Sequence, residues 1–207
     1  MAVFIFLALV MLVPIIWLLL GAFKPDAEII AYPPTFFPAE FTLKNFTKCM
    51  QRIDIIQYMK NSIIFSVGTT IPALFVNTLA GYAFARYEFK GKNIIFVTFL
   101  ATMMIPFQVI IIPEFLEIHM FGMYDTYWGL IIPKIASAYW IFMMRSAFAG
   151  LPKELEEAAR IDGLSEFGIY SRIMLPLIKP ALVTMIILGI NGNWNDLLWP
   201  LIMTSTS

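Results

Sequence analysis

Five long apolar segments constrain the fold of this chain more than any other feature. The segments are residues 2–22, 61–85, 93–113, 126–144 and 180–203. They carry no acidic or basic side chain, apart from one lysine in the fourth segment and a short polar insertion in the fifth. A helix needs roughly 20 apolar residues to cross the hydrocarbon core of a bilayer. The sequence therefore predicts an all-α polytopic membrane protein, a helical bundle with five transmembrane helices in a single domain over residues 1–207.

The composition supports this class and argues against several others. Hydrophobic residues make up 60% of the chain and charged residues 14%, whereas a soluble domain carries about 25% charged residues. The mean hydropathy is +0.80, which is typical of polytopic membrane proteins. The net charge of zero argues against a nucleic-acid partner. One cysteine, Cys49, and one histidine, His119, leave almost no room for a His–Cys catalytic pair or a His-ligated metal site.

The first apolar segment has an alternative interpretation as a signal peptide. It lacks a basic leader, and no small-x-small cleavage site follows it. Its apolar stretch also exceeds the usual ~7–15 residues of a signal peptide. We therefore interpret residues 2–22 as a transmembrane helix.

Basic residues in the short loops predict the orientation in the membrane, because cytoplasmic loops are enriched in Lys and Arg. Loops 86–92 and 145–179 carry three and five basic residues, while loop 114–125 carries none. The longest loop, 24–60, disagrees, but it mixes five basic residues with four acidic ones. The shorter loops place the N-terminus and residues 145–179 in the cytoplasm and the C-terminus outside.

The polar loop between the last two apolar segments contains the most specific motif. Residues 157–176 read EAARIDGLSEFGIYSRIMLP, that is, E-A-A, three residues, Gly, nine residues, Ile, one residue and Leu-Pro. Acidic residues near its start favour a helix N-terminus, and Gly163 is expected to stop that helix. Ser165 is expected to cap a second short helix, and Pro176 to end it.

One face of the first short helix is expected to be narrow. Leu155, Ala158, Ala159 and Asp162 share that face at helical spacing. Two adjacent alanines would let the helix enter a cleft on another protein. The alternative is an amphipathic helix lying on the membrane surface. Alanines and acidic residues fit that alternative poorly, because such helices favour bulky apolar anchors and a basic polar face.

A second group of candidate residues lies in the fifth apolar segment. Polar groups at membrane depth are costly unless they face a partner or an aqueous pathway. Amides, a carboxylate and aromatic faces would suit a polyhydroxylated ligand, so we consider a substrate pathway lined by Asn191, Asn193, Trp194, Asn195 and Asp196. Two alternatives remain open. Trp194 and Trp199 would anchor the outer interface, or the asparagines would bond to neighbouring helices.

Three further features of the apolar segments carry expectations. Pro106 predicts a kink in the third, either for gating or simply for packing. Lys134 in the fourth is expected to extend to the headgroups, with a substrate or ion-pair role as the less favoured interpretation. Gly68 and Gly81 in the second indicate close helix packing.

The loop motif resembles the cytoplasmic coupling loop of binding-protein-dependent ABC importer permeases, and every fixed position is matched. Other stretches resemble the carbohydrate-uptake, maltose-type subgroup of that family: FKPDAEI at 23–29, NSII at 61–64, GYAFAR at 81–86, MIP at 104–106 and WNDLLWP at 194–200. The similarity covers essentially the whole chain. The family has six spans, so the resemblance implies that this chain lacks the last helix and the cytoplasmic tail.

The resemblance implies a role, a site and a set of partners. The chain would be a sugar permease subunit of the plasma (inner) membrane that forms half of an alternating-access pathway, without catalytic activity. The implied ATPase-coupling residues are Glu157, Ala158, Ala159, Asp162, Gly163, Ile173, Leu175 and Pro176. The implied partners are ABC ATPase subunits, a second permease subunit, an extracytoplasmic solute-binding protein, the sugar and membrane lipid.

ATP is expected to be used by the partner ATPase, because this chain has no Gly-x4-Gly-Lys-Ser/Thr phosphate-binding loop; we expect no cofactor or metal on the chain itself. Two other functions stay open. One is an ABC permease for a non-sugar solute, and the other is a channel or membrane scaffold outside the ABC class.

Overall fold

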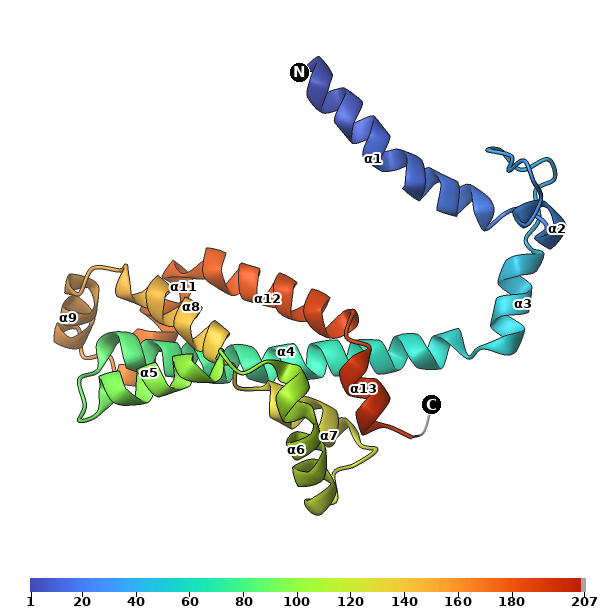
Figure 1. Cartoon of the computed structure of the whole chain (residues 1–207). Coiled ribbons are helices and arrows are strands. Elements are labelled where there is room, and N and C mark those ends of the chain that lie inside the picture. The colour runs from blue at the N-terminus through green and yellow to red at the C-terminus, as the bar shows by residue number, and fades with distance from the viewer. Residues whose placement is uncertain (206–207) are drawn as a thin grey trace. The chain divides into compact units, whose positions relative to one another are not determined.

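The computed structural model describes residues 1–205, except for the side chain of Ala2, and these residues form helices without any β-strand (Figure 1). This confirms the expected all-α class. The elements are α1 (Ala2–Gly21), α2 (Asp26–Ile29), α3 (Lys44–Arg52), α4 (Ile55–Arg86), α5 (Lys92–Thr102), α6 (Phe107–Met120), α7 (Tyr127–Ile131), the 3-10 turn η1 (Ile132–Lys134), α8 (Ala138–Ala149), α9 (Glu154–Ile161), α10 (Glu166–Gly168), the π-helical stretch η2 (Ile169–Met174), α11 (Leu175–Leu177), α12 (Lys179–Trp194) and α13 (Leu198–Met203).

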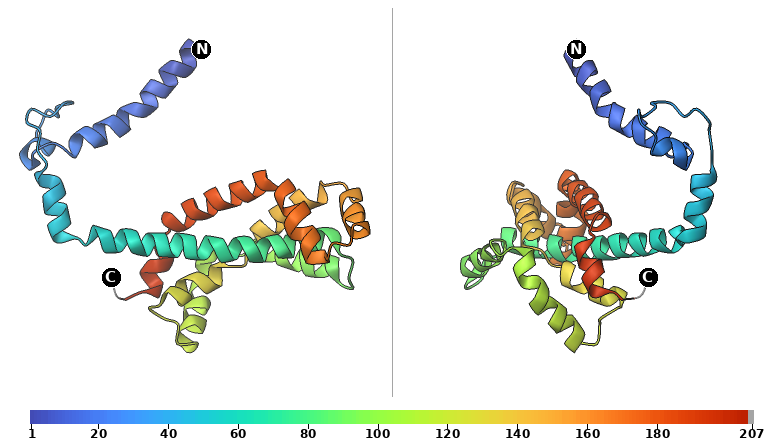
Figure 2. Two further views of the ribbon diagram at one scale, coloured as in Figure 1. Left: turned by 180° about the vertical axis from the view of Figure 1, so that it is seen from behind. Right: turned by 45° about the vertical axis from the view of Figure 1, so that its right-hand side comes forward.

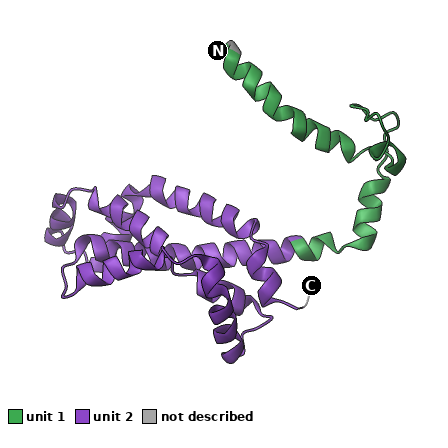
Figure 3. Ribbon diagram, in the orientation of Figure 1, with its two compact units in different colours: residues 1–58 green, residues 59–207 purple. Residues whose placement is uncertain are grey.

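The chain divides into two compact units, residues 1–58 and residues 59–207 (Figure 3). The first unit contains α1, whose Val3–Gly21 stretch has no residue buried within the chain. Lys24 lies beyond α1, where it is buried and donates to the backbone oxygen and the hydroxyl of Thr35. The carboxylate of Glu28 accepts hydrogen bonds from the Thr35 hydroxyl and from the Ala39 amide. These bonds give the proline-rich loop after α2 a defined shape.

The second unit is organised around α4, a continuous helix of 32 residues. Both views in Figure 2 show α5, α8 and α12 running alongside α4. Gly81 allows the closest approach, because a Cβ atom at this position would lie 2.5 Å from the Cβ of Met144 in α8. Gly189 of α12 faces Thr70 of α4, where an added Cβ would lie 3.3 Å from the Thr70 side chain. The close packing expected at Gly81 is therefore confirmed.

Several of the expected spans are interrupted instead of straight. Only Val3–Gly21 and Ile55–Arg86 are single helices long and apolar enough to cross a bilayer among the described residues. The chain bends by 101° at residues 103–106, between the helices Lys92–Thr102 and Phe107–Met120. A second bend, of 79°, lies between Glu166–Leu177 and Lys179–Trp194. Counting each bent pair as one span gives up to four, so five spans stay a prediction.

The first of these bends occurs where the sequence predicted a kink. Pro106 has extended backbone angles, φ −61° and ψ 139°, immediately before α6. A proline cannot donate a hydrogen bond to the preceding turn and disfavours helical geometry in the residue before it. The kink is therefore a complete break in the helix.

Candidate functional site

The turn after α9 has the geometry that the sequence predicted for Gly163. This residue has a φ of +81°, in the left-handed region that glycine adopts without strain. The Gly163 amide donates to the Arg160 carbonyl, and the Leu164 amide donates to the Ala159 carbonyl, both at 3.0 Å. This pair of bonds is a Schellman motif, which satisfies the free carbonyls at a helix C-terminus. Gly163 therefore ends α9 and reverses the chain.

The second short helix begins as expected but continues further. The Ser165 hydroxyl accepts a hydrogen bond from the Gly168 amide at 3.2 Å and so caps α10. Pro176 does not end this segment, because it lies inside α11 and the helical path reaches Leu177. The wider π-helical turns of η2 come directly before Pro176, and such turns commonly accompany local disruptions of the α-helical bonding pattern. The expectation that Pro176 stops the helix was wrong.

The four residues expected to share one face of α9 differ in their exposure in the structure. Ala159 is buried, at 5% exposure, whereas Ala158, Leu155 and Asp162 are exposed. The expected face did not include Ile161, which lies between Ala158 and Asp162 in the sequence and is 86% exposed. The exposed surface of α9 therefore combines Leu155, Ala158, Ile161 and Asp162.

The other residues of the implied coupling set lie on both sides of the turn. Glu157 and Gly163 are exposed on the α9 side. Ile173 and Leu175 are half-buried against the core, and Pro176 is exposed. Phe167 was not singled out by the sequence, yet it is 60% exposed in α10. Phe167 therefore adds an exposed apolar side chain to this polar loop.

One ion pair and one hydrogen bond join the loop to the end of α4, and a second ion pair lies within the loop. The Nε atom of Arg86 lies 3.1 Å from Oε1 of Glu156, and the two side chains are only 4% and 6% exposed. Arg160 binds the Glu166 carboxylate through two nitrogens, at 2.7 and 3.1 Å. The Tyr87 hydroxyl donates to the same carboxylate at 2.8 Å. Sequence reasoning missed this arrangement, because nothing local pairs residues about 70 positions apart.

The titration behaviour of Glu166 reflects its partners. Hydrogen bonds from Arg160 and Tyr87 stabilise the ionised carboxylate and lower the pKa of Glu166 to about 2. Burial, together with the hydrogen bond to Glu166, raises the pKa of Tyr87 to about 12. Glu166 is therefore negatively charged, and Tyr87 neutral, across the physiological pH range.

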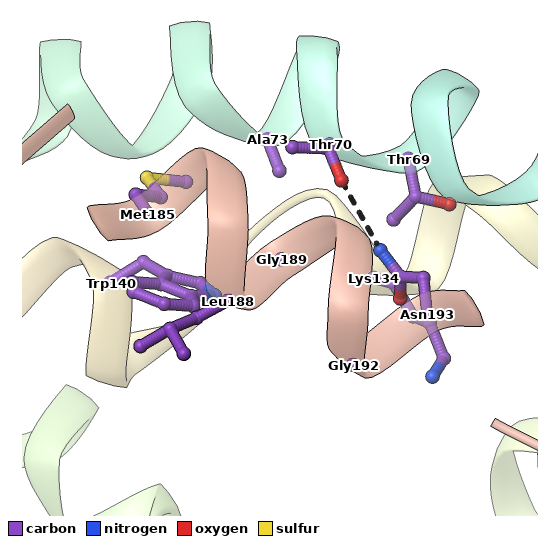
Figure 4. Close-up of a pocket in the computed structure, with 10 residues that line it drawn as sticks. All are labelled: Thr69, Thr70, Ala73, Lys134, Trp140, Met185, Leu188, Gly189, Gly192 and Asn193. Carbon is purple, nitrogen blue, oxygen red and sulfur yellow. Dashed lines mark hydrogen bonds between the residues drawn. The ribbon is translucent and has the colours of Figure 1, made fainter. Parts of the chain in front are cut away.

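A pocket of about 300 Å³ lies between α4 and α12, with Lys134 and Trp140 at its side (Figure 4). It is lined by Thr69, Thr70, Ala73, Lys134, Trp140, Met185, Leu188, Gly189, Gly192 and Asn193. Figure 4 shows the amide of Asn193 directed at the hydroxyl of Thr70, 3.5 Å away. The Thr69 hydroxyl is buried and has no hydrogen-bond partner among the described residues. Donors from two helices thus line one cavity next to an indole ring.

Of the five residues predicted for a substrate pathway, only Asn193 lines this pocket. Asn191 and Asn195 are exposed and linked to each other, since the Asn195 amide donates to the Asn191 carbonyl at 2.8 Å. Trp194 is 45% exposed. The Asp196 carboxylate accepts a bond from the Trp199 amide at 3.2 Å and pairs with the Lys134 ammonium.

Two expectations about single residues were wrong. Trp199 is fully buried, and its indole nitrogen donates to the Leu130 carbonyl at 3.1 Å, so it belongs to the core and does not anchor the interface. Lys134 does not extend away to headgroups, because it pairs with Asp196 and its ammonium lies 5.7 Å from the Phe65 ring centre. The ion-pair alternative for Lys134 is the one that holds.

Asn77 of α4 is a further polar residue that the sequence did not reveal. It is completely buried. Its amide nitrogen donates to the Ile135 carbonyl at 2.8 Å, and its oxygen accepts from the Ser137 amide at 2.9 Å. It thereby satisfies the backbone where the helix between α7 and α8 is interrupted, which a spanning segment requires.

No group of three or more His, Cys, Asp or Glu side chains comes together in residues 1–205.

The comparisons with known proteins agree with the loop motif. The model of the family "Binding-protein-dependent transport system inner membrane component" matches residues 77–207. The Bacillus subtilis arabinooligosaccharides transport system permease protein AraQ is 40% identical over 203 residues, which are 97% of this chain and 72% of AraQ. The lactose transport system permease protein LacG of Rhizobium radiobacter is 32% identical over 94% of this chain and 70% of LacG.

A solved structure supports the same fold. One chain in the crystal structure of a bacterial ABC transporter involved in the import of the acidic polysaccharide alginate superposes with a TM-score of 0.90. The sequences are 24% identical, and the match covers 99% of this chain and 72% of the other. With the family model covering the whole polar loop, this chain belongs to the family of inner-membrane components of binding-protein-dependent transport systems, as a transport permease subunit.

Proposed function

We propose that the chain is the membrane-spanning permease subunit of an ATP-driven ABC importer for sugars, coupled to a cytoplasmic ATPase through residues 152–176. The observation that carries this proposal is the exposed α9 face, which ends in the Schellman turn at Gly163. Small and apolar side chains at Ala158 and Ile161 stand on a polar loop without a covering element of the chain itself. Such a surface is suited to a cleft in another protein.

The names of several relatives support a carbohydrate as the transported solute. AraQ is named for arabinooligosaccharides, LacG for lactose, and NgcG of Streptomyces coelicolor, 30% identical over 99% of this chain, for diacetylchitobiose. The pocket between α4 and α12 offers hydroxyl, amide and ammonium groups beside the Trp140 indole. Convergent polar groups and an aromatic face are the chemistry that binds a polyhydroxylated ring. We place the sugar's passage at Asn193, Thr69 and Thr70.

The partners follow from this role. Two ATPase subunits would drive transport, one of them through this loop, a second permease subunit would complete the pathway, and an extracytoplasmic binding protein would deliver the sugar. The chain would lie in the inner membrane with its N-terminus and the 145–179 loop in the cytoplasm. The basic residues of loops 86–92 and 145–179 support this orientation. ATP would be bound by the partner ATPase and not by this chain.

The test is reconstitution of the complex in vesicles with its ATPase, partner permease and binding protein. We expect the ATPase to co-purify with this chain and labelled oligosaccharide to accumulate only with ATP. Uptake of amino acids or metal ions in place of sugars would contradict the substrate, and a chain that never retains the ATPase would contradict the coupling.

A further inference from the structure

The Arg86–Glu156 pair is unusual because both charges are removed from solvent. Arg86 is the last residue of α4, and Glu156 lies in the first turn of α9. Their side chains are 4% and 6% exposed. Burying two charges costs desolvation energy that their attraction repays only partly, so apolar residues often stabilise a fold equally well. A buried pair that stability alone does not require can serve to fix the relative position of two elements.

Further bonds join the same end of α4 to the segments on both sides of α9. Arg86 Nη2 donates to the Leu151 carbonyl at 2.8 Å, just before α9. The Tyr87 hydroxyl donates to Glu166 at 2.8 Å, just after the Gly163 turn. Glu166 in turn holds Arg160 of α9. The end of α4 is thus joined to the loop by hydrogen bonds before and after the short helix and by the ion pair within it.

The same helix also reaches the pocket. Thr69, Thr70 and Ala73 of α4 line the cavity, and α4 is unbroken between them and Arg86. At 1.5 Å per residue, the separation along the axis is about 25 Å. A further hydrogen bond joins α4 to η2 between the pocket and Arg86, because the Thr78 and Tyr170 hydroxyls are 2.7 Å apart in the core. One continuous helix, with Pro72 inside it, therefore carries both the loop attachment and part of the cavity wall.

We propose that Arg86 and Glu156 are positioning residues that fasten α9 to α4, so that a displacement of α9 moves α4 and the pocket wall as one body. The inference rests on the proposed function, in which the ATPase acts on α9. Neither side chain reaches the exposed α9 face, since both are buried within the chain. The pair acts on the passage of sugar without touching the ATPase or the sugar.

The first experiment separates attachment from folding. In the reconstituted complex, Glu156→Gln and Arg86→Gln each weaken the attachment but leave an unpaired partner. The double variant Arg86→Met with Glu156→Leu removes both charges and should fold well. We expect it to retain the ATPase and hydrolyse ATP while sugar taken up per ATP falls about tenfold, within the range reported for coupling residues. The matched control is Glu154→Gln, an exposed acidic residue of the same turn.

The outcomes distinguish this inference from the proposed function. An unchanged ratio of uptake to ATP hydrolysis in the double variant would overturn the inference and leave the proposed function intact. Loss of ATPase binding in the double variant alone would also overturn it, because the pair would then shape the docking surface. Failure of the unaltered chain to retain the ATPase would instead overturn the proposed function.

A cross-linking experiment tests the same idea with the pair intact. Cys49 is exposed and is first replaced by Ser. Tyr87→Cys and Glu166→Cys are then joined by a short bis-thiosulfonate linker across the space that their hydrogen bond now spans. If the loop that contains α9 and α10 moves as one body with the end of α4, cross-linked complexes take up sugar at the rate of the same Tyr87→Cys, Glu166→Cys protein without the linker. Uptake that stops on cross-linking and returns on reduction would show that the loop separates from the end of α4 during transport.

Discussion

The Lys134 ammonium pairs with the Asp196 carboxylate and so joins the interruption after α7 to the interruption after α12. Both side chains are partly buried, at 25% and 17% exposure. Asp196 also accepts a hydrogen bond from the amide of Trp199, in the first turn of α13. Lys134 lines the pocket wall. The two broken helices are therefore held together by charge at the edge of the cavity.

Removing the charge of Asp196 should impair uptake more than folding. In Asp196→Asn, an oxygen still accepts the bond from Trp199 while the attraction to Lys134 is lost, so we expect a loss of about 1–3 kcal/mol in stability. Asp196→Ala should lose more, because the bond to the Trp199 amide also disappears. Thermal unfolding in detergent and sugar uptake in vesicles measure the two effects. Equal stability and uptake for Asp196→Ala and the unaltered chain would refute a role for the pair.

Gly163→Val should uncouple the loop while leaving the protein in the membrane. A side chain at a φ of +81° costs roughly 1–2 kcal/mol, and a β-branched one is the most strained. The Schellman turn would open and α9 would lose its direction. Gly150→Ala is the matched control, because Gly150 ends α8 with a helical φ of −76°. Pull-down of the ATPase should fall for Gly163→Val and not for the control.

Ala158→Trp tests the exposed face of α9 without changing the turn. Ala158 is exposed, so the fold has room for an indole, but a cleft on the ATPase would not. We expect ATPase binding to be lost while thermal stability stays the same. The same substitution at buried Ala159 should instead destabilise the chain, because an indole would overpack a filled core. Normal ATPase binding by Ala158→Trp would place the contact elsewhere.

Asn77→Leu should destabilise the chain strongly. The leucine matches the volume but leaves the Ile135 carbonyl and the Ser137 amide unpaired in the core. Each unsatisfied buried group costs about 1–3 kcal/mol, so unfolding in detergent should occur well below that of the unaltered chain. Asn93→Leu, at an exposed position of α5, serves as control and should have little effect. A similar small effect at both positions would contradict the bridging role of Asn77.

The loop should loosen in acid because of Glu166. Its pKa is lowered to about 2 in the folded chain, from an ordinary value of 4.5. A depressed carboxylate pKa adds stability that is fully present above the ordinary value and is lost as the pH falls from there toward the folded value. Hydrogen exchange of residues 151–168, corrected for intrinsic rates, should therefore speed up between about pH 4.5 and 2. Glu166→Gln should lack this step, and its presence there would assign the effect to another group.

Much of this protein was readable from the sequence where the controlling physics is local. The apolar segments predicted the all-α class, because transfer into a bilayer depends on the summed composition of a stretch and not on its neighbours. Gly163 and Ser165 were identified correctly, since a left-handed φ and a hydroxyl cap are properties of single residues and adjacent backbone. The coupling motif shares this local character, because its fixed positions lie within 20 consecutive residues.

The tertiary structure alone decided how distant residues pair and which side of each helix is covered. Helical spacing placed Ala158 and Ala159 on one face, but packing of α9 against η2 buries Ala159 and leaves Ala158 free. Lys134 and Asp196 are 62 positions apart, and Arg86 and Glu156 are 70 apart. Such contacts form only when the chain has folded back on itself, because the desolvation of each charge must be balanced by a partner that no local pattern specifies.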